Sequence, residues 1–183
     1  MTKPANPTPA GLAALAVACF LFFAMLSGAV GTDSLPLIGA WLIGGFVIQL
    51  VTAWFDLKAG NNPGGNTFLF FACMFMLAGG IEMFLKYEAA KNGTPLDVTA
   101  DGFAWLANTL ILWGWTPAFC RKFSLLSVII LLVDLALPFL ALADLGVLPK
   151  WVTQISAYSL LGAGVAAIVL LTMMISKKPK ETT

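Results

Sequence analysis

Six apolar segments, each close to the length of a membrane-spanning helix, account for most of this sequence. They cover roughly residues 11–31, 36–55, 67–86, 102–119, 123–145 and 151–175. A helix needs about 20 mostly apolar residues to cross a bilayer, and no segment alternates polar and apolar residues as a barrel strand does. The sequence therefore predicts an all-α membrane protein built as a six-transmembrane-helix bundle.

The composition argues against a soluble globule. Of the 183 residues, 60% are hydrophobic and only 10% are charged, whereas a soluble domain carries about 25% charged residues. The net charge of +1 and the lack of a basic run argue against a nucleic-acid partner. The sequence has no histidine, no metal-ligand spacing, no nucleophile–base pair and no phosphate-binding glycine loop. We therefore expect no enzyme activity, no metal and no cofactor.

Lysine and arginine are divided unequally between the two sides of such a bundle. The side that holds both termini and the second and fourth loops carries seven of the ten, namely Lys3, Lys58, Arg121, Lys122, Lys177, Lys178 and Lys180. The other side carries Lys86, Lys91 and Lys150. Because cytoplasmic loops are richer in Lys and Arg, we expect a multi-pass protein of the cytoplasmic (inner) membrane with both termini in the cytoplasm. The expected parts are an N-terminal segment (1–10), a six-helix domain (11–175) and a basic tail (176–183).

A polar, proline-containing segment precedes the first apolar segment directly. Pro7 and Pro9 predict extended or turn backbone, and Asn6 is a natural helix cap. Such a segment joined to a spanning helix predicts part of a solute path. The loop 58–67 has turn composition throughout, and we expect Asn66 or Thr67 to cap the third helix.

Several polar and aromatic side chains interrupt the apolar segments. Gln49 and Asn108 lie inside predicted spans, so each must form an interhelical hydrogen bond or face a polar lumen. Trp113 and Trp115 flank Gly114 and indicate either an interfacial belt or an aromatic gate.

Asp134 is the most unusual of these residues, because a carboxyl near the middle of the fifth segment would lie at the middle of the membrane. Pro138 follows one turn later and leaves the carbonyl of residue 134 without its helical donor. Two roles stay open: a protonated carboxyl that donates a hydrogen bond, or a proton site that faces water. Glu82 is less informative, since Lys86 lies four residues on and suits an i,i+4 pair.

Pairs of small residues four apart predict close helix packing. They are Ala40 with Gly44, Gly162 with Ala166, and Ala163 with Ala167. Such pairs serve either packing within one chain or a ring of subunits.

The segment Asn6-Pro7-Thr8-Pro9-Ala10-Gly11-Leu12 resembles the Asn-Pro-Ala-Pro-Leu-Gly-Leu signature of the acetate uptake transporters, also called succinate–acetate permeases. The resemblance continues at Gln49, across residues 56–61 and at Asn66-Thr67-Phe68. It implies a six-helix homohexamer in the cytoplasmic membrane. Family members move acetate, and sometimes succinate, either with protons or as a channel. Counting from the motifs, the family's hydrophobic constriction falls at Leu15 and near Met76.

The leading hypothesis is a transporter or channel for a small monocarboxylate, acetate first. Together, the resemblance and the polar interruptions predict eight residues of the solute path: Asn6, Pro7, Pro9, Leu15, Gln49, Met76, Asn108 and Trp113. Asp134 is the candidate for proton coupling. One alternative is a channel for a small neutral solute such as urea or a short amide. Another is a membrane accessory subunit with no open path. The expected partners are a small carboxylate, the lipid bilayer and further copies of the chain.

Overall fold

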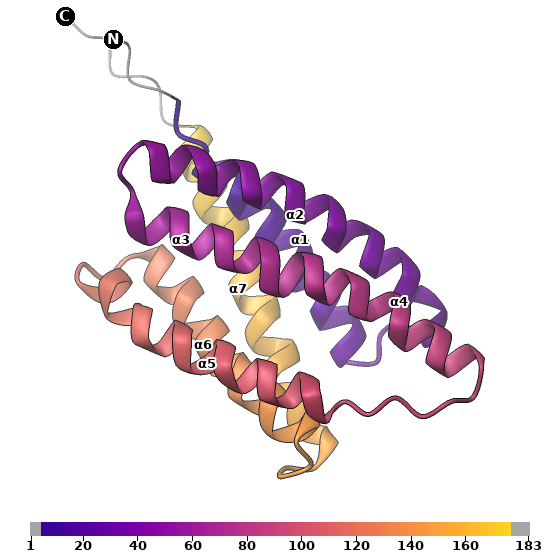
Figure 1. Cartoon of the computed structure of the whole chain (residues 1–183). Coiled ribbons are helices and arrows are strands. Elements are labelled where there is room, and N and C mark those ends of the chain that lie inside the picture. Colours follow the sequence, from indigo (N-terminus) through magenta and orange to yellow (C-terminus); the bar gives the residue numbers. More distant parts are fainter. Residues whose placement is uncertain (1–4, 177–183) are drawn as a thin grey trace, which may run out of the picture.

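The structure is a computed structural model that describes residues 5–176, and within that range it contains helices and no strand. The long helices are α1 (Thr8–Leu26), α2 (Leu35–Lys58), α3 (Asn62–Phe70), α4 (Ala78–Lys91), α5 (Thr99–Cys120), α6 (Leu125–Asp144) and α7 (Thr153–Ile175). A π-helical stretch, η2 (Phe71–Leu77), joins α3 to α4 without a break, and short 3₁₀ turns η1 (Thr32–Ser34) and η3 (Lys150–Val152) precede α2 and α7. The result is six helical rods, as predicted (Figure 1).

Five of the six rods are both long and apolar enough to cross a membrane. They are Thr8–Leu26, Thr32–Lys58, Asn62–Lys91, Leu125–Asp144 and Lys150–Ile175. The sixth rod, α5, has 22 residues but is less apolar, because it contains Asp101, Asn108 and Pro117. Large apolar side chains such as Leu37, Trp41 and Phe103 lie exposed on the outer surface, as lipid contact requires. The chain is therefore a multi-pass helical membrane protein.

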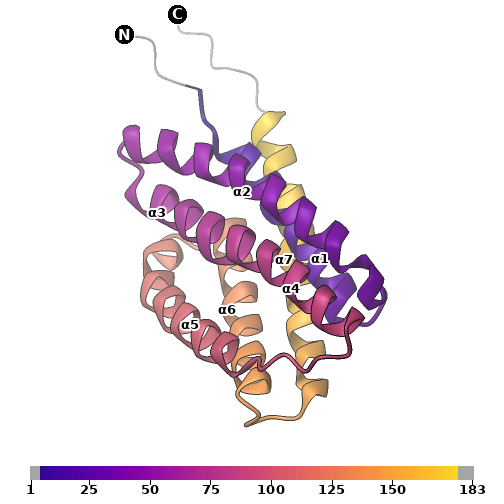
Figure 2. The ribbon, with the colours of Figure 1, turned by 45° about the vertical axis from the view of Figure 1, so that its right-hand side comes forward.

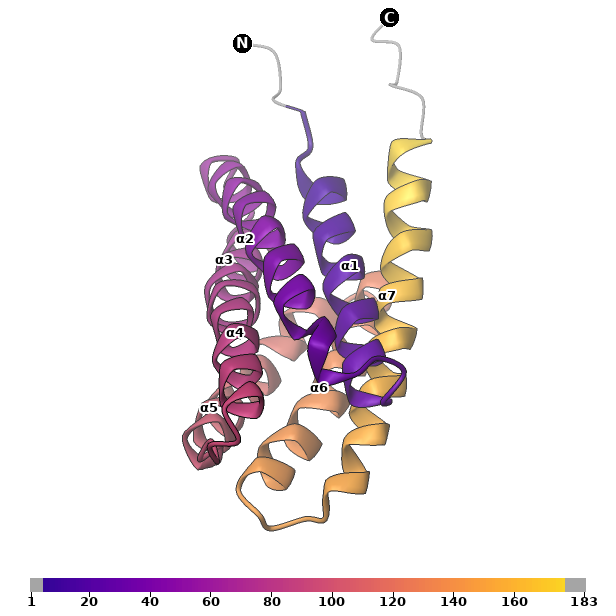
Figure 3. The same ribbon diagram turned by 90° about the vertical axis from the view of Figure 1, so that its right-hand side faces the viewer.

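The rods form a ring in the order α5, α6, α7, α1, α2 and the α3–η2–α4 rod. Figure 2 shows the continuous α3–η2–α4 rod between α2 and α5, and the seam between α3 and α5 is the loosest in the ring. The start of α1 and the end of α7 lie at the same end of the bundle (Figure 3). We call this the terminal end, and the end with the α6–α7 connection the opposite end.

Glycines allow the closest helix contacts in this ring. A Cβ at Gly39 in α2 would lie 2.7 Å from the carbonyl oxygen of Gly80 in α4. A Cβ at Gly11 in α1 would lie 2.5 Å from the ring of Phe68 in α3. Of the predicted small-residue pairs, Ala163 and Ala167 are fully buried inside the protomer, whereas Ala40 and Gly44 lie on its exposed surface.

Three helices begin at least three residues earlier than predicted: α1 at Thr8, α3 at Asn62 and α5 at Thr99. The first helix starts at Thr8, and Pro7 has the dihedral angles φ −82° and ψ −14°. These angles fit a turn or a helix start, so of the two predicted backbone forms, extended or turn, the extended one was wrong. Proline fits the first turn of a helix because the N–H it lacks has no helical partner there. The cap position of α1 is Pro7, one residue after the predicted cap Asn6. Asn6 Oδ1 accepts from the N–H of Thr8, the first residue of the helix, at 3.0 Å.

The third rod also starts inside its predicted loop, at Asn62. Its cap is Asn61, whose Oδ1 accepts from the N–H of Gly64 at 3.3 Å. The prediction that Asn66 or Thr67 caps this helix was therefore wrong. Pro63 in the first turn is again compatible with a helix start.

Candidate substrate path

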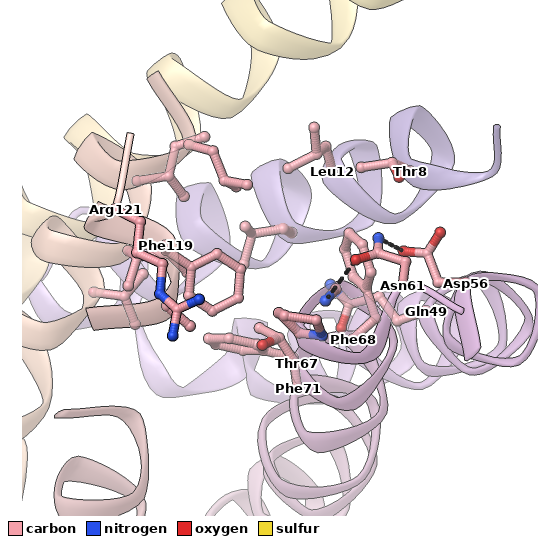
Figure 4. A pocket seen from close by; sticks show the side chains of 18 of the residues that line it. Thr8, Leu12, Gln49, Asp56, Asn61, Thr67, Phe68, Phe71, Phe119 and Arg121 are labelled. Atoms are coloured by element: carbon pink, nitrogen blue, oxygen red, sulfur yellow. Dashed lines mark hydrogen bonds between the residues drawn. The ribbon is translucent and has the colours of Figure 1, made fainter. Parts of the chain in front are cut away.

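A cavity of about 410 Å³ opens at the terminal end of the ring (Figure 4). Its walls come from α1, α2, α3, η2, α6 and the end of α5. The deep walls are mainly apolar, and the polar groups lie mostly at the mouth. The residues that line it include Thr8, Leu12, Leu15, Gln49, Asp56, Asn61, Thr67, Phe68, Phe71, Phe119, Arg121, Lys122, Ile129 and Val133. We call it the terminal cavity.

The mouth of the terminal cavity carries both signs of charge. Arg121 and Lys122 are exposed there, and no carboxylate within residues 5–176 pairs with either of them. Asp56 is only 3% exposed. Its Oδ2 accepts from Asn61 Nδ2 at 3.2 Å, and its carbonyl accepts from the Asn61 N–H at 2.9 Å. Asn61 therefore joins the end of α2 to the start of α3 and holds Asp56 in place (Figure 4).

Gln49 lies deeper in the same cavity and is fully buried. Its Nε2 donates to the carbonyl of Gly11 in α1 at 3.3 Å, which is the interhelical hydrogen bond that the sequence predicted as one of two roles. Gln49 is also one of the residues that line the terminal cavity. Gly11 carries no side chain at the point where Phe68 and Thr52 approach it most closely.

A closed stretch of core separates the terminal cavity from a second cavity of about 240 Å³ at the opposite end. On α1, Leu15 lines the first cavity and Phe22 the second. Positions 15 and 22 are two helical turns apart, which is about 10 Å. On α6 the corresponding residues are Val133 and Leu140. On the third rod, Phe71 lines the first cavity and Met83 the second. The larger buried apolar side chains between these limits include Cys19, Phe75, Met76 and Leu137. We call these four residues the plug.

The π-helical stretch η2 supplies two of the plug residues and an aromatic contact to α5. The rings of Phe71 and Phe75 lie 4.6 Å apart. Phe75 also packs against Trp105 in α5 with 5.2 Å between ring centroids, and Phe70 packs against Trp115 at 5.5 Å. These contacts close the loosest seam of the ring. A π-helical segment often marks a functional site, and here it supplies half of the plug between the two cavities.

The opposite cavity is lined by ion pairs. Lys86 pairs with Glu82, which confirms the predicted i,i+4 pair, and its Nζ lies 3.8 Å from Asp101. Lys150 pairs with Asp144 at 2.7 Å. The lysines at this end therefore face carboxylates, in contrast to Arg121 and Lys122 at the terminal mouth.

The predicted path residues fall into two groups. Leu15 and Gln49 line the terminal cavity, and Met76 belongs to the plug. Asn6, Pro7 and Pro9 flank Thr8, which lines the mouth, but they do not line the cavity themselves. Asn108 is buried in α5, and neither it nor Trp113 lines either cavity.

Trp113 and Asp134 contact each other between α5 and α6. Trp113 Nε1 donates to the carbonyl of Asp134 at 3.2 Å, so the acceptor that Pro138 leaves free has a partner. The side chain of Asp134 is buried and contacts the hydroxyl of Thr116. Asp134 is not among the residues that line the terminal cavity, although its neighbour Val133 is.

Six polar residues of the cavity were not predicted as path residues: Thr8, Asp56, Asn61, Thr67, Arg121 and Lys122. Four of them belong to the motifs at 6–12, 56–61 and 66–68, and these motifs were the available signal. On sequence grounds, Arg121 and Lys122 indicated only the orientation of the chain in the membrane.

The chain is a multi-pass membrane protein, because five of its rods are long and apolar enough to cross a membrane. Its six rods form a ring with a cavity at each end. The solved structure of the bacterial acetate channel SatP has the same fold: its TM-score is 0.82 at 18% sequence identity, over 94% of this chain and 93% of that chain. No protein-family model and no curated protein matches the sequence. The resemblance to acetate uptake transporters is thus confirmed at the level of the fold. The similar structure is that of a channel.

Proposed function

We propose that this chain is a membrane channel or transporter for a small monocarboxylate, acetate first, and a member of the acetate uptake transporter family. The observation that carries the proposal is the terminal cavity, with exposed cations at its mouth and an amide at its depth. Arg121 and Lys122 would raise the local concentration of an anionic solute. The shared fold with an acetate channel supports the same conclusion.

The proposed path runs along the axis of the ring. A solute passes Thr8 and Leu12, reaches Gln49 and Leu15, and is then stopped by the plug. Asn6, Pro7 and Pro9 shape the mouth by fixing the start of α1. The closed plug requires that Phe75 or Met76 move before a solute passes to the opposite cavity.

We further propose a homohexamer in the cytoplasmic membrane with both termini in the cytoplasm. The exposed pair Ala40 and Gly44 borders a groove on the outer surface next to Trp41 and Val17. Small residues beside a large aromatic suit packing against a neighbouring helix. The excess of Lys and Arg that the sequence predicts for the side of both termini supports the orientation.

We propose that uptake is coupled to protons and favours acetate over succinate. Succinate brings a second carboxylate, and the deep walls of the cavity are apolar, so its desolvation costs more. The contacts of Asp134 with Thr116 and Trp113 fit one of its two predicted roles, that of a protonated carboxyl that donates a hydrogen bond.

The test is uptake of labelled acetate into proteoliposomes, with and without an inward proton gradient, against protein-free liposomes. Labelled urea and succinate are measured in parallel. Gradient-stimulated acetate uptake above the lipid leak is expected. Urea flux without acetate flux would show that the chain is a channel for a small neutral solute with the same fold. If no solute moved, the accessory-subunit alternative would be favoured.

A further inference from the structure

Two buried oxygen atoms among the lining residues of the terminal cavity have no hydrogen-bond partner. They are Gln49 Oε1 and Thr67 Oγ1, from side chains that are 0% and 8% exposed. Most buried polar atoms in proteins are paired, and an unpaired one costs about 1–3 kcal/mol. Two such atoms in the wall of one cavity indicate that a ligand supplies the missing partners.

The orientation of the Gln49 amide is fixed by its neighbour. Nε2 donates to the Gly11 carbonyl, and the reversed amide would place Oε1 against that carbonyl oxygen. The free atom of Gln49 is therefore an acceptor and cannot donate. Thr67 carries a hydroxyl, which can donate. Gln49 Oε1 can therefore pair only with a donor, whereas Thr67 Oγ1 can donate to the same partner or accept from it.

We propose that the solute passes Gln49 and Thr67 as the neutral carboxylic acid and not as the carboxylate anion; this inference rests on the proposed monocarboxylate function. The acid O–H donates to Gln49 Oε1, and the acid carbonyl accepts from the Thr67 hydroxyl. A carboxylate has acceptors only, so it leaves Gln49 Oε1 unpaired and places a negative charge beside it.

The charges around the cavity agree with this assignment. The cations that line it, Arg121 and Lys122, are at the mouth, and no Lys or Arg of the described chain lines its deeper part. The one acidic residue that lines it, Asp56, is buried on α2. The anion is therefore collected at the mouth, takes a proton from water, and returns that proton to water on the far side. One proton accompanies each acid, and no net charge crosses the membrane.

Acetamide is the direct probe of this chemistry. It has nearly the size of acetic acid, carries both an N–H donor and a carbonyl acceptor, and is neutral at every working pH. In proteoliposomes we expect a raised acetamide permeability, measured by stopped-flow light scattering against protein-free liposomes. We also expect acetate uptake that does not respond to a membrane potential set with potassium and valinomycin.

Two substitutions with matched controls assign the effect to these atoms. Gln49→Leu and Thr67→Val should each lower both fluxes about tenfold, as loss of one well-made hydrogen bond implies. Gln154→Leu removes another glutamine that donates to an α1 carbonyl, that of Leu26 at 2.9 Å. Thr109→Val removes another buried threonine hydroxyl. Neither residue lines the terminal cavity, so both controls should keep the wild-type fluxes.

The outcomes separate this inference from the function on which it rests. Acetate uptake that follows the membrane potential, with acetamide excluded, would show that the anion passes; the inference would be overturned and the acetate function would stand. Absence of any acetate flux in the wild-type protein would overturn both. The wild-type measurements decide the question even if Gln49→Leu fails to fold.

Discussion

At the scale of single residues, Asp134 shows how a buried carboxyl is accommodated without a counter-charge. The Thr116 hydroxyl contacts both Asp134 Oδ2 and the Leu112 carbonyl, the latter at 2.9 Å. The hydroxyl has one proton and can donate to only one of these two oxygens. If it donates to the Leu112 carbonyl, a protonated Asp134 carboxyl supplies the other hydrogen bond by donating to the Thr116 hydroxyl. Asn supplies the same donor. Asp134→Asn should therefore keep both acetate uptake and its stimulation by a proton gradient.

The matched variant Asp134→Leu removes the donor and should lower stability by about 1–3 kcal/mol, measured as a fall in the thermal unfolding midpoint in detergent. A folded Asp134→Asn protein without gradient stimulation would contradict this account and restore Asp134 as the proton site.

Gly11 is the residue at which α1, α2 and α3 approach most closely beside the cavity. A methyl group there would meet the Phe68 ring at 2.5 Å and Thr52 Cγ2 at 2.8 Å. Gly11→Ala should destabilise the protein by about 1–3 kcal/mol through overpacking, again measured by thermal unfolding. Gly114→Ala is the control, because a Cβ at that helical position meets nothing within 4 Å. Equal stability of the two variants would contradict the close packing described for α1.

At the scale of elements, η2 presents opposite faces to the path and to the outside. Phe75 is buried in the plug, whereas its neighbour Met74 is 50% exposed. Phe75→Ala should open the plug and raise acetate flux severalfold, measured in proteoliposomes. Met74→Ala shortens a side chain of the same element and should leave the flux unchanged.

Phe75→Ala also removes core packing, at a typical cost of about 3–5 kcal/mol. Phe75→Leu is the milder variant and should raise the flux in the same direction. A folded Phe75 variant with wild-type flux would place the closed part of the path elsewhere.

The sequence predicted the rods well and their ends poorly. Apolar length determined the six rods, because the bilayer sets it independently of tertiary contacts. Proline and asparagine at 6–9 and 61–63 suit both a turn and the first turn of a helix, so composition could not decide where α1 and α3 begin. Once α3 begins at Asn62, Thr67 belongs to its interior and lines the cavity.

The site was predictable only in part, for a physical reason. Gln49 could be singled out because an amide inside an apolar span has to find a partner. The place of Arg121 and Lys122 at the mouth depends on how α5 ends next to α2 and α3, which no local pattern encodes. The π-helical conformation of η2 could not be predicted either, because its residues are apolar on every side and give no pattern that distinguishes it from an α-helix.

At the scale of the whole molecule, the two ends of the bundle should face different compartments. In a background without native cysteines, Lys122→Cys lies at the mouth of the terminal cavity. Lys150→Cys lies in η3, in the α6–α7 connection that marks the opposite end. We expect a membrane-impermeant maleimide added to intact cells to label Lys150→Cys, and to label Lys122→Cys only after permeabilisation. The reverse pattern would invert the proposed orientation.

We propose that the solute path runs through the terminal cavity, and blocking the mouth of this cavity tests the proposal most directly. Thr8 lines that mouth and is partly exposed, so Thr8→Cys in a cysteine-free background can be modified with a bulky thiol reagent. Labelled acetate uptake is then compared before and after modification. We predict that modification abolishes the uptake and that excess acetate slows the modification. Unchanged acetate flux through a fully modified protein would show that the path lies outside this cavity.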